Sequence, residues 1–120
     1  MSHLTRICTQ IKDKTMLEKS LKDLGYTTSK NAYIKEYNGK KHMVEIALSD
    51  RVGFQKSGQV FEFIGDMMYF RENKERFMGK VTQKYAQNKV MSMARSKGYL
   101  TSQSVLSDGT IKLNLRRAMA

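Results

Sequence analysis

Seven lysine and arginine residues lie within one 24-residue stretch, and they are the side chains best suited to binding chemistry. They are Lys74, Arg76, Lys80, Lys84, Lys89, Arg95 and Lys97, with Glu75 as the one acid among them. The stretch supplies +6 of the chain's net charge of +11. Ammonium and guanidinium groups hold phosphate and carboxylate oxygens through charge-assisted hydrogen bonds. The sequence therefore predicts a polyanionic partner.

The residue pattern predicts that one helix, from about residue 73 to residue 97, presents these cations, with Gly98 ending it. We expect one stripe of this helix to pack on a sheet, made of Gly79, Thr82, Ala86, Val90 and Met93. The opposite side carries Lys80, Lys84, Gln87, Asn88 and Arg95. This side is either a phosphate-binding surface or a solvated helix face. Like charges four residues apart destabilise a helix slightly, which favours a function.

Three groups of residues are candidates for nucleic-acid binding. The helix contributes Lys74, Arg76, Lys80, Lys84, Asn88 and Arg95. A predicted hairpin with Asn38-Gly39 at its tip contributes Tyr37, Lys40 and His42, which could stack bases and hold phosphates. A two-residue turn there would place Tyr33 in the core. The chain end contributes Arg116 and Arg117, either as phosphate contacts or as a solubilising tail.

Catalytic and metal-binding patterns are absent from the sequence. One cysteine and two histidines cannot supply the four Cys/His ligands of a structural zinc site. If residues 3–11 form one strand, His3 and Cys8 point to opposite faces, and we expect Cys8 to be a small buried hydrophobe. Glu62 and Asp66 lie too far apart on a strand to act as a coupled pair. With no glycine-rich nucleotide motif, we expect a non-enzymatic protein without metal or cofactor.

The bulk composition limits the class of protein. A chain of 120 residues with 40% hydrophobic residues predicts a single domain spanning residues 1–120. No apolar run approaches the length of a membrane helix, and the first residues lack a secretory signal, so we expect a cytoplasm-like compartment. The charge predicts RNA, DNA, an acidic protein surface or anionic lipid as partner. Nothing in the pattern predicts the oligomeric state.

Two helices and three hairpins make up the predicted fold. After the strand at residues 3–11, a helix begins at Asp13 or at a Thr15–Glu18 capping box, and it ends at Gly25. Three hairpins turn at Asn38-Gly39, Ser57-Gly58 and Asp108-Gly109. The second would place Phe54 opposite Phe61 and Val52 opposite Phe63, and the third Leu106 opposite Ile111. The order is β-α-β-β-β-β-α-β-β, an α+β fold with an antiparallel sheet and both helices on one face.

Several short motifs, in order along the chain, also resemble a known family. They are Met1-Ser2-His3, Ile7-x-Thr9-x-Ile11, Leu21-Lys22-Asp23-Leu24-Gly25-Tyr26, Val52-Gly53-Phe54, Val81 to Val90, Gly98-Tyr99 and Asp108-Gly109-Thr110-Ile111. The family is the conserved proteins of cyanobacteria and plastids called hypothetical chloroplast reading frame thirty-five, a domain of unknown function. The resemblance implies a cyanobacterium, a plastid or a cyanophage as the setting. It implies no chemistry.

The sequence thus leads to two hypotheses of binding. The first is a non-enzymatic nucleic-acid-binding protein whose Lys/Arg-rich helix carries the contacts. The second is a protein-interaction adaptor, in which the basic face docks an acidic partner or Met67-Met68-Tyr69-Phe70 docks an apolar one.

Overall fold

The structure, a computed structural model, describes residues 4–36, 38–105 and 111–117, and in residues 99–117 it describes the backbone and the Lys112 side chain alone. Ten elements follow one another along the chain: β1 (Leu4–Cys8), α1 (Lys14–Asp23), β2 (Ser29–Lys35), β3 (Lys41–Ala47), β4 (Val52–Ser57), β5 (Val60–Asp66), a 3₁₀ turn η1 (Met67–Tyr69), α2 (Lys74–Ser96), β6 (Tyr99–Val105) and β7 (Ile111–Arg117).

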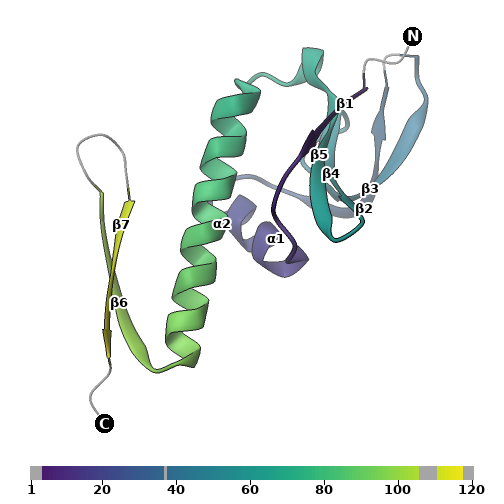
Figure 1. Cartoon of the computed structure of the whole chain (residues 1–120). Helices are drawn as coiled ribbons and strands as arrows, with labels where there is room; N and C mark the ends of the chain where they lie inside the picture. Colours follow the sequence, from purple (N-terminus) through teal and green to yellow (C-terminus); the bar gives the residue numbers. More distant parts are fainter. Residues whose placement is uncertain (1–3, 37, 106–110, 118–120) are drawn as a thin grey trace.

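The first five strands form one antiparallel sheet in the order β1-β5-β4-β3-β2, and β6 pairs with β7 in a separate ribbon. Figure 1 shows α2 between the sheet and this ribbon, which gives the molecule an elongated shape of 59 × 30 × 22 Å. The predicted α+β class and the order of strands and helices are confirmed. No helix in the described part of the chain is long and apolar enough to cross a bilayer.

Both helices cover the same face of the sheet, as predicted. Their buried residues, Leu17 and Leu21 of α1 and Phe77, Val81 and Tyr85 of α2, join one core with sheet residues Ile46, Val52, Phe54, Phe61 and Phe63. Phe77 is central to it, because its ring lies 4.9 Å from that of Phe63 and 5.0 Å from that of Phe70. Aromatic rings at such distances add to the stability that their burial provides.

The β4–β5 hairpin keeps the predicted face but changes its register. Phe54 lies opposite Phe63 rather than Phe61, and Ser57 pairs with Val60. The two turn residues are therefore Gly58 and Gln59, and Gly58 has the positive φ of +65° that such a turn needs. A shift of two residues leaves every side chain on the same face, so the predicted core set survives.

A smaller apolar cluster lies on the opposite face of the sheet. Ile34, Val44, Ala47 and Ile64 form it, and β2 contacts β5 although the two strands are not neighbours in the sheet. Gly53 permits the close approach: a Cβ there would collide with the Ile46 carbonyl and with the Val44 side chain. Glycine is therefore required where β3 pairs with β4.

The β2–β3 hairpin was predicted with the wrong register. Lys35 pairs with Lys41 and Tyr33 with Met43, so the connection is longer than two residues and the facing side chains change. Tyr33 is 57% exposed and Met43 49% exposed, whereas Tyr33 was expected in the core. A one-residue change of register moves side chains to the other face.

Helix α1 begins and ends as its sequence indicates. Asp13 is the N-cap, accepting a hydrogen bond from the Met16 N–H, so the alternative Thr15–Glu18 capping box is not used. Gly25, with φ of +92°, follows its end. Upstream, the predicted first strand is shorter than expected. Cys8 is its last residue, at the sheet edge, and Cys8 is exposed rather than buried.

Helix α2 has the predicted bounds but not the predicted buried stripe. Its caps are Asn73 and Lys97, and it buries Phe77, Val81, Tyr85, Gln87, Asn88 and Ala94. The expected stripe of Gly79, Thr82, Ala86, Val90 and Met93 is exposed. Two stripes with helical spacing exist on this helix, and the one with the larger rings faces the core.

The β6–β7 ribbon follows α2 and runs back beside it (Figure 1). Val105 pairs with Ile111, one residue away from the predicted pairing of Leu106, which itself lies outside the described residues. Arg116 and Arg117 belong to β7 rather than to a tail that follows it.

Candidate nucleic-acid interface

The side of α2 that lies beside α1 carries three of the predicted cations. Lys84 lies near Asp23 of α1, and Arg95 shares a hollow with Met16 and Lys19 of α1. Lys80 lies one turn before Lys84 on the same side. Lys80, Lys84 and Arg95 therefore form a row along one side of α2, and Lys19 of α1 lies beside this row.

Asn88 lies within this row, but it is not a surface residue. It is 8% exposed, and its amide donates hydrogen bonds to the Ser20 hydroxyl at 3.1 Å and to the Asp23 carboxylate at 3.0 Å. The prediction that Asn88 binds nucleic acid is therefore corrected. Its partners lie more than 60 positions away in the sequence, so Asn88 fastens α2 to α1.

Asp23 is a carboxylate on this side of the two helices. Lys19 donates to it at 2.9 Å, one helical turn away. The hydrogen bond from Lys19 lowers the pKa of Asp23, with further lowering by the Asn88 amide and the charge of Lys84. Asp23 is therefore a carboxylate at neutral pH and offsets part of the positive charge here.

A small hollow lies between the two helices. It has a volume of about 140 Å³ and is lined by Met16, Lys19, Asn88, Met91, Ser92 and Arg95. We call it the seam hollow. Lys19 and Arg95 provide cationic donors, and Ser92 provides a hydroxyl, at its wall. Such donors suit a phosphate or another oxyanion.

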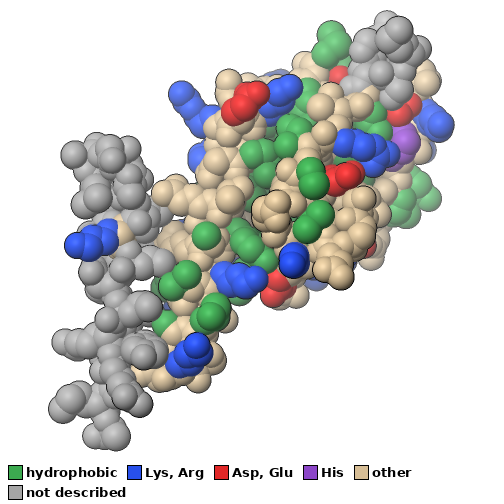
Figure 2. All heavy atoms as spheres, viewed as in Figure 1, with side chains coloured by type: hydrophobic (Ala, Val, Ile, Leu, Met, Phe, Trp, Pro, Cys, Tyr) green, Lys and Arg blue, Asp and Glu red, His purple; other side chains and the backbone are tan. Residues whose placement is uncertain are grey.

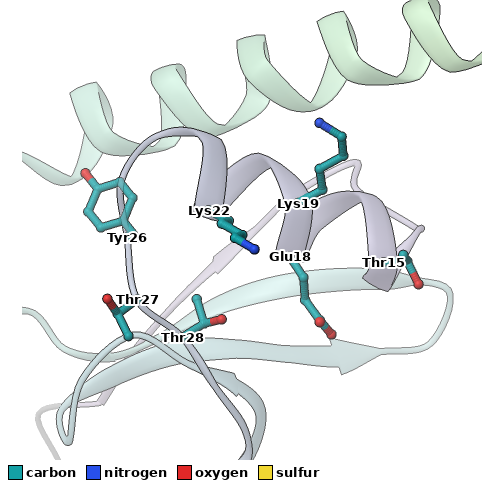
Figure 3. Close-up of a pocket in the computed structure, with 7 residues that line it drawn as sticks. All are labelled: Thr15, Glu18, Lys19, Lys22, Tyr26, Thr27 and Thr28. Carbon is teal, nitrogen blue, oxygen red and sulfur yellow. The ribbon is translucent and has the colours of Figure 1, made fainter.

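A second, larger hollow lies on the other side of α1. It has a volume of about 470 Å³ and is lined by Thr15, Glu18, Lys19, Lys22, Tyr26, Thr27 and Thr28 (Figure 3). We call it the α1 hollow. Lys19 lines both hollows, so the two are neighbours on α1. Glu18 is paired with Lys30 at 3.4 Å, which leaves Lys22 and three threonine hydroxyls as donors in the α1 hollow.

Tyr26 connects the α1 hollow to α2. Its hydroxyl donates to Glu72 at 2.6 Å and accepts from Lys80 at 3.1 Å, and Lys80 also donates to Glu72 at 3.0 Å. Burial, followed by the bond to Glu72, raises the pKa of Tyr26. The Tyr26 hydroxyl lowers the pKa of Glu72 and raises that of Lys80. The network fixes the position of the Lys80 side chain, but Lys80 already forms an ion pair with Glu72.

We define the α1–α2 basic surface as Lys19, Lys22, Lys80, Lys84 and Arg95. Two of its members have ion-pair partners, since Lys19 pairs with Asp23 and Lys80 with Glu72. Lys22, Lys84 and Arg95 pair with no acid within the residues described. The surface therefore carries a surplus of three positive charges.

The remaining predicted residues lie elsewhere. Lys74 and Arg76 are exposed in the first turn of α2. Lys40 is exposed, and His42 is half-buried with its Nε2 2.7 Å from Glu36 Oε1, on a hairpin away from α2 in Figure 1. Tyr37 lies outside the described residues. The backbone of Arg116 and Arg117 lies in β7, and their side chains lie outside the description.

The sequence did not predict Lys19 and Lys22 as members of this surface. Lys19 and Lys22 were missed because they lie on a short helix whose charges nearly balance locally. The pairing of α1 with α2 is a tertiary contact, and no signal in either helix alone could have found it. In the described part of the chain, no three His, Cys, Asp or Glu side chains gather as a metal site would require.

Comparison with known proteins identifies the family. The model of the family described as "Protein of unknown function (DUF1257)" matches residues 20–114, so the chain belongs to this family. Proteins printed as "Uncharacterized protein ycf35" from Guillardia theta and Pyropia yezoensis are each 30% identical over 98% of both chains. The protein of the same name from Cyanophora paradoxa is 27% identical, again over 98% of both chains. The predicted resemblance is confirmed. No solved structure matches the chain significantly.

Proposed function

We propose that this member of the DUF1257 family binds nucleic acid through the sugar-phosphate backbone, using the α1–α2 basic surface. The observation that supports this most is the surplus of cations where two helices meet. Lys22, Lys84 and Arg95 come from separate turns and form no ion pair in the described part of the chain, although Lys84 lies near Asp23. Exposed lysines and arginines that merely solubilise a helix usually alternate with acids.

The two hollows supply the second part of the argument. Arg95, Lys19 and Ser92 line the seam hollow, and Lys22 lines the α1 hollow together with Thr15, Thr27 and Thr28. These groups can donate hydrogen bonds to phosphate and sugar oxygens, without contacting the edges of the bases. Such donors position a protein on a nucleic acid without reading its sequence. We therefore expect binding that depends little on base sequence.

An acidic protein surface is the alternative partner for the same cations. Carboxylates and phosphates both attract ammonium and guanidinium groups, but phosphate chains carry a condensed layer of counterions that binding releases. The salt dependence of binding thus separates the two partners. For the location, we propose a cytoplasmic or stromal compartment, where nucleic acid is accessible.

The test is fluorescence anisotropy with a labelled DNA duplex, a labelled single-stranded RNA and a labelled polyglutamate, titrated with salt. The triple variant Lys22→Gln, Lys84→Gln and Arg95→Gln should reduce the log–log salt slope for duplex binding by about 2 to 3. The matched control is Lys35→Gln, Lys41→Gln and Lys56→Gln, which removes the same charge from exposed sheet positions. It should leave most of the slope intact.

Two results would contradict the proposal. Equal losses of slope in the two triple variants would mean that the net charge acts without a defined surface. Tighter binding of polyglutamate than of either nucleic acid at about 150 mM salt, where exposed charges are well screened, would favour the acidic protein partner.

A further inference from the structure

The side of α2 opposite the α1–α2 basic surface carries an apolar groove. It has a volume of about 530 Å³ and is lined by Cys8, Thr9, Gln10, Ile11, Thr82, Tyr85, Ala86, Lys89, Val90 and Met93. Val90 is 37% exposed and Met93 50% exposed. Figure 2 shows apolar side chains gathered on this face, over α2 and β1. Apolar side chains that gather at a groove indicate an interaction site more than apolar side chains scattered singly do.

The groove reaches a strand edge that has no neighbour in the sheet. β1 is the outermost strand and pairs with β5 alone in the described sheet. The Thr9 N–H donates to the Phe61 carbonyl at 3.2 Å, which assigns odd-numbered positions of this segment to the β5 side. Arg6 and Cys8 therefore direct their backbone N–H and C=O groups to the open edge. Such an edge is a template for an added strand.

Hydrogen bonds hold the wall of the groove in place. The Tyr85 hydroxyl accepts hydrogen bonds from the Lys12 N–H at 3.4 Å and the Asp13 N–H at 3.2 Å, which fastens α2 to the segment after β1. Thr9 donates to the Phe61 carbonyl at 2.6 Å, which fixes the same segment to β5. A preformed groove lowers the ordering cost of binding.

The charge at the groove selects the kind of partner. Lys89 is the charged residue of the lining, and no acid contributes to it. Exposed Lys12 adjoins the lining, and the nearby Asp13 carboxylate is committed to the cap of α1. A second copy of the chain carries the same net charge of +11. An acidic partner is attracted where a second copy is repelled.

We propose that the groove and the β1 edge together bind an extended segment of a partner protein with alternating apolar and acidic residues. The segment adds as a strand beside β1, where its backbone pairs with Arg6 and Cys8. Every second side chain enters the groove against Ala86 and Val90. The acidic side chains between them point to the other face of the added strand, which is the face that carries the exposed Arg6 side chain. This mode of binding combines backbone hydrogen bonds with pockets for alternate side chains. It uses no residue of the α1–α2 basic surface.

The test uses the full chain, labelled with ¹⁵N, and a ten-residue peptide with valine at alternate positions and glutamate between them. The peptide should slow hydrogen exchange at the amides of Arg6 and Cys8. Val90→Asp should weaken binding about tenfold, since an apolar contact is lost and a like charge is added. Gln83→Asp is the matched control, because it adds the same charge at an exposed position of α2 outside the groove, and it should leave affinity nearly unchanged.

Three outcomes would overturn the proposal. The first is unchanged exchange at Arg6 and Cys8 at millimolar peptide. The second is equal binding of a peptide of the same composition with its valines in one block. The third is slowed exchange without peptide that depends on protein concentration, which would assign the groove to a second copy. A failure of nucleic-acid binding would not affect any of these readouts.

Discussion

The two sides of α2 differ in what they expose, although they belong to one helix. The side beside α1 carries the half-buried Lys80 and Lys84 and the exposed Arg95, which lines the seam hollow. The side that faces β1 exposes Thr82, Ala86, Val90 and Met93 around a larger apolar groove. Between them, Phe77, Val81 and Tyr85 are buried in the core. The comparison shows that a helix with two apolar stripes can bury one in the core and leave the other exposed.

The largest expected effect comes from the same substitution made on each stripe. Val81 is fully buried, and Val90 is 37% exposed. Val81→Ala should lower the free energy of unfolding by about 2 kcal/mol, because it leaves a cavity. Val90→Ala should lower it by less than about 0.5 kcal/mol, as expected for an exposed position.

Urea denaturation of the two variants measures this difference. Equal losses of stability would mean that both stripes belong to the core. A larger loss of stability for Val90→Ala would mean that the stripe containing Val90 packs in the core, as the sequence predicted.

The second test concerns Asn88, which lies between the core and the basic surface. Asn88→Ala removes hydrogen bonds to Ser20 and Asp23, so it should lower the free energy of unfolding by about 1 kcal/mol. Gln83→Ala, at an exposed position of the same helix, is the control. If Asn88→Ala instead weakened nucleic-acid binding with unchanged stability, Asn88 would be a ligand contact, as the sequence suggested.

The smallest effect is a pH dependence at the Tyr26–Glu72–Lys80 network. The pKa of Glu72 is lowered in the folded protein, so its stabilising effect exists above the usual value of 4.5 and is lost as pH falls through the lowered value. The pKa of Lys80 is raised, so its effect exists below 10.5 and is lost as pH rises through the raised value.

Tyr26→Phe should therefore destabilise the protein slightly between these two limits and have little effect at more acidic pH. Nuclear magnetic resonance titration should show the pKa of Glu72 rising toward 4.5 in this variant. Tyr33→Phe, at an exposed position on the β2–β3 hairpin, is the control. An unchanged pKa of Glu72 in Tyr26→Phe would exclude the hydroxyl as the cause.

Local sequence patterns predicted most of the fold. Asp13 and Gly25 mark the ends of α1, and Gly58 marks a hairpin turn, because caps and turns depend on neighbours in the chain. Phe54 and Phe63 were placed on the correct face because a strand repeats every two residues. Registers were less predictable: the β2–β3 connection is longer than Asn38-Gly39 alone suggests.

The choice between the two α2 stripes could not be predicted in the same way. Gly79, Thr82 and Ala86 have the spacing and small size of a packed stripe, but Phe77 and Tyr85 bury more apolar surface. From the sequence alone, the polar Asn88 is expected on the surface, because its partners Ser20 and Asp23 on α1 are known only from the structure. The sequence therefore predicted only part of the candidate surface. Its α2 cations follow from the sequence, whereas Lys19 and Lys22 of α1 join them through tertiary packing.

One measurement tests the central claim that α2 carries its phosphate contacts on the side beside α1. The ¹⁵N-labelled protein is titrated with a short DNA duplex or a single-stranded RNA at moderate salt. The account predicts saturable shift changes at the amides of Lys19, Lys22, Lys84 and Arg95, with Ala86 and Val90 unmoved. Shift changes concentrated at Ala86 and Val90, or on the β2–β3 hairpin, would contradict it.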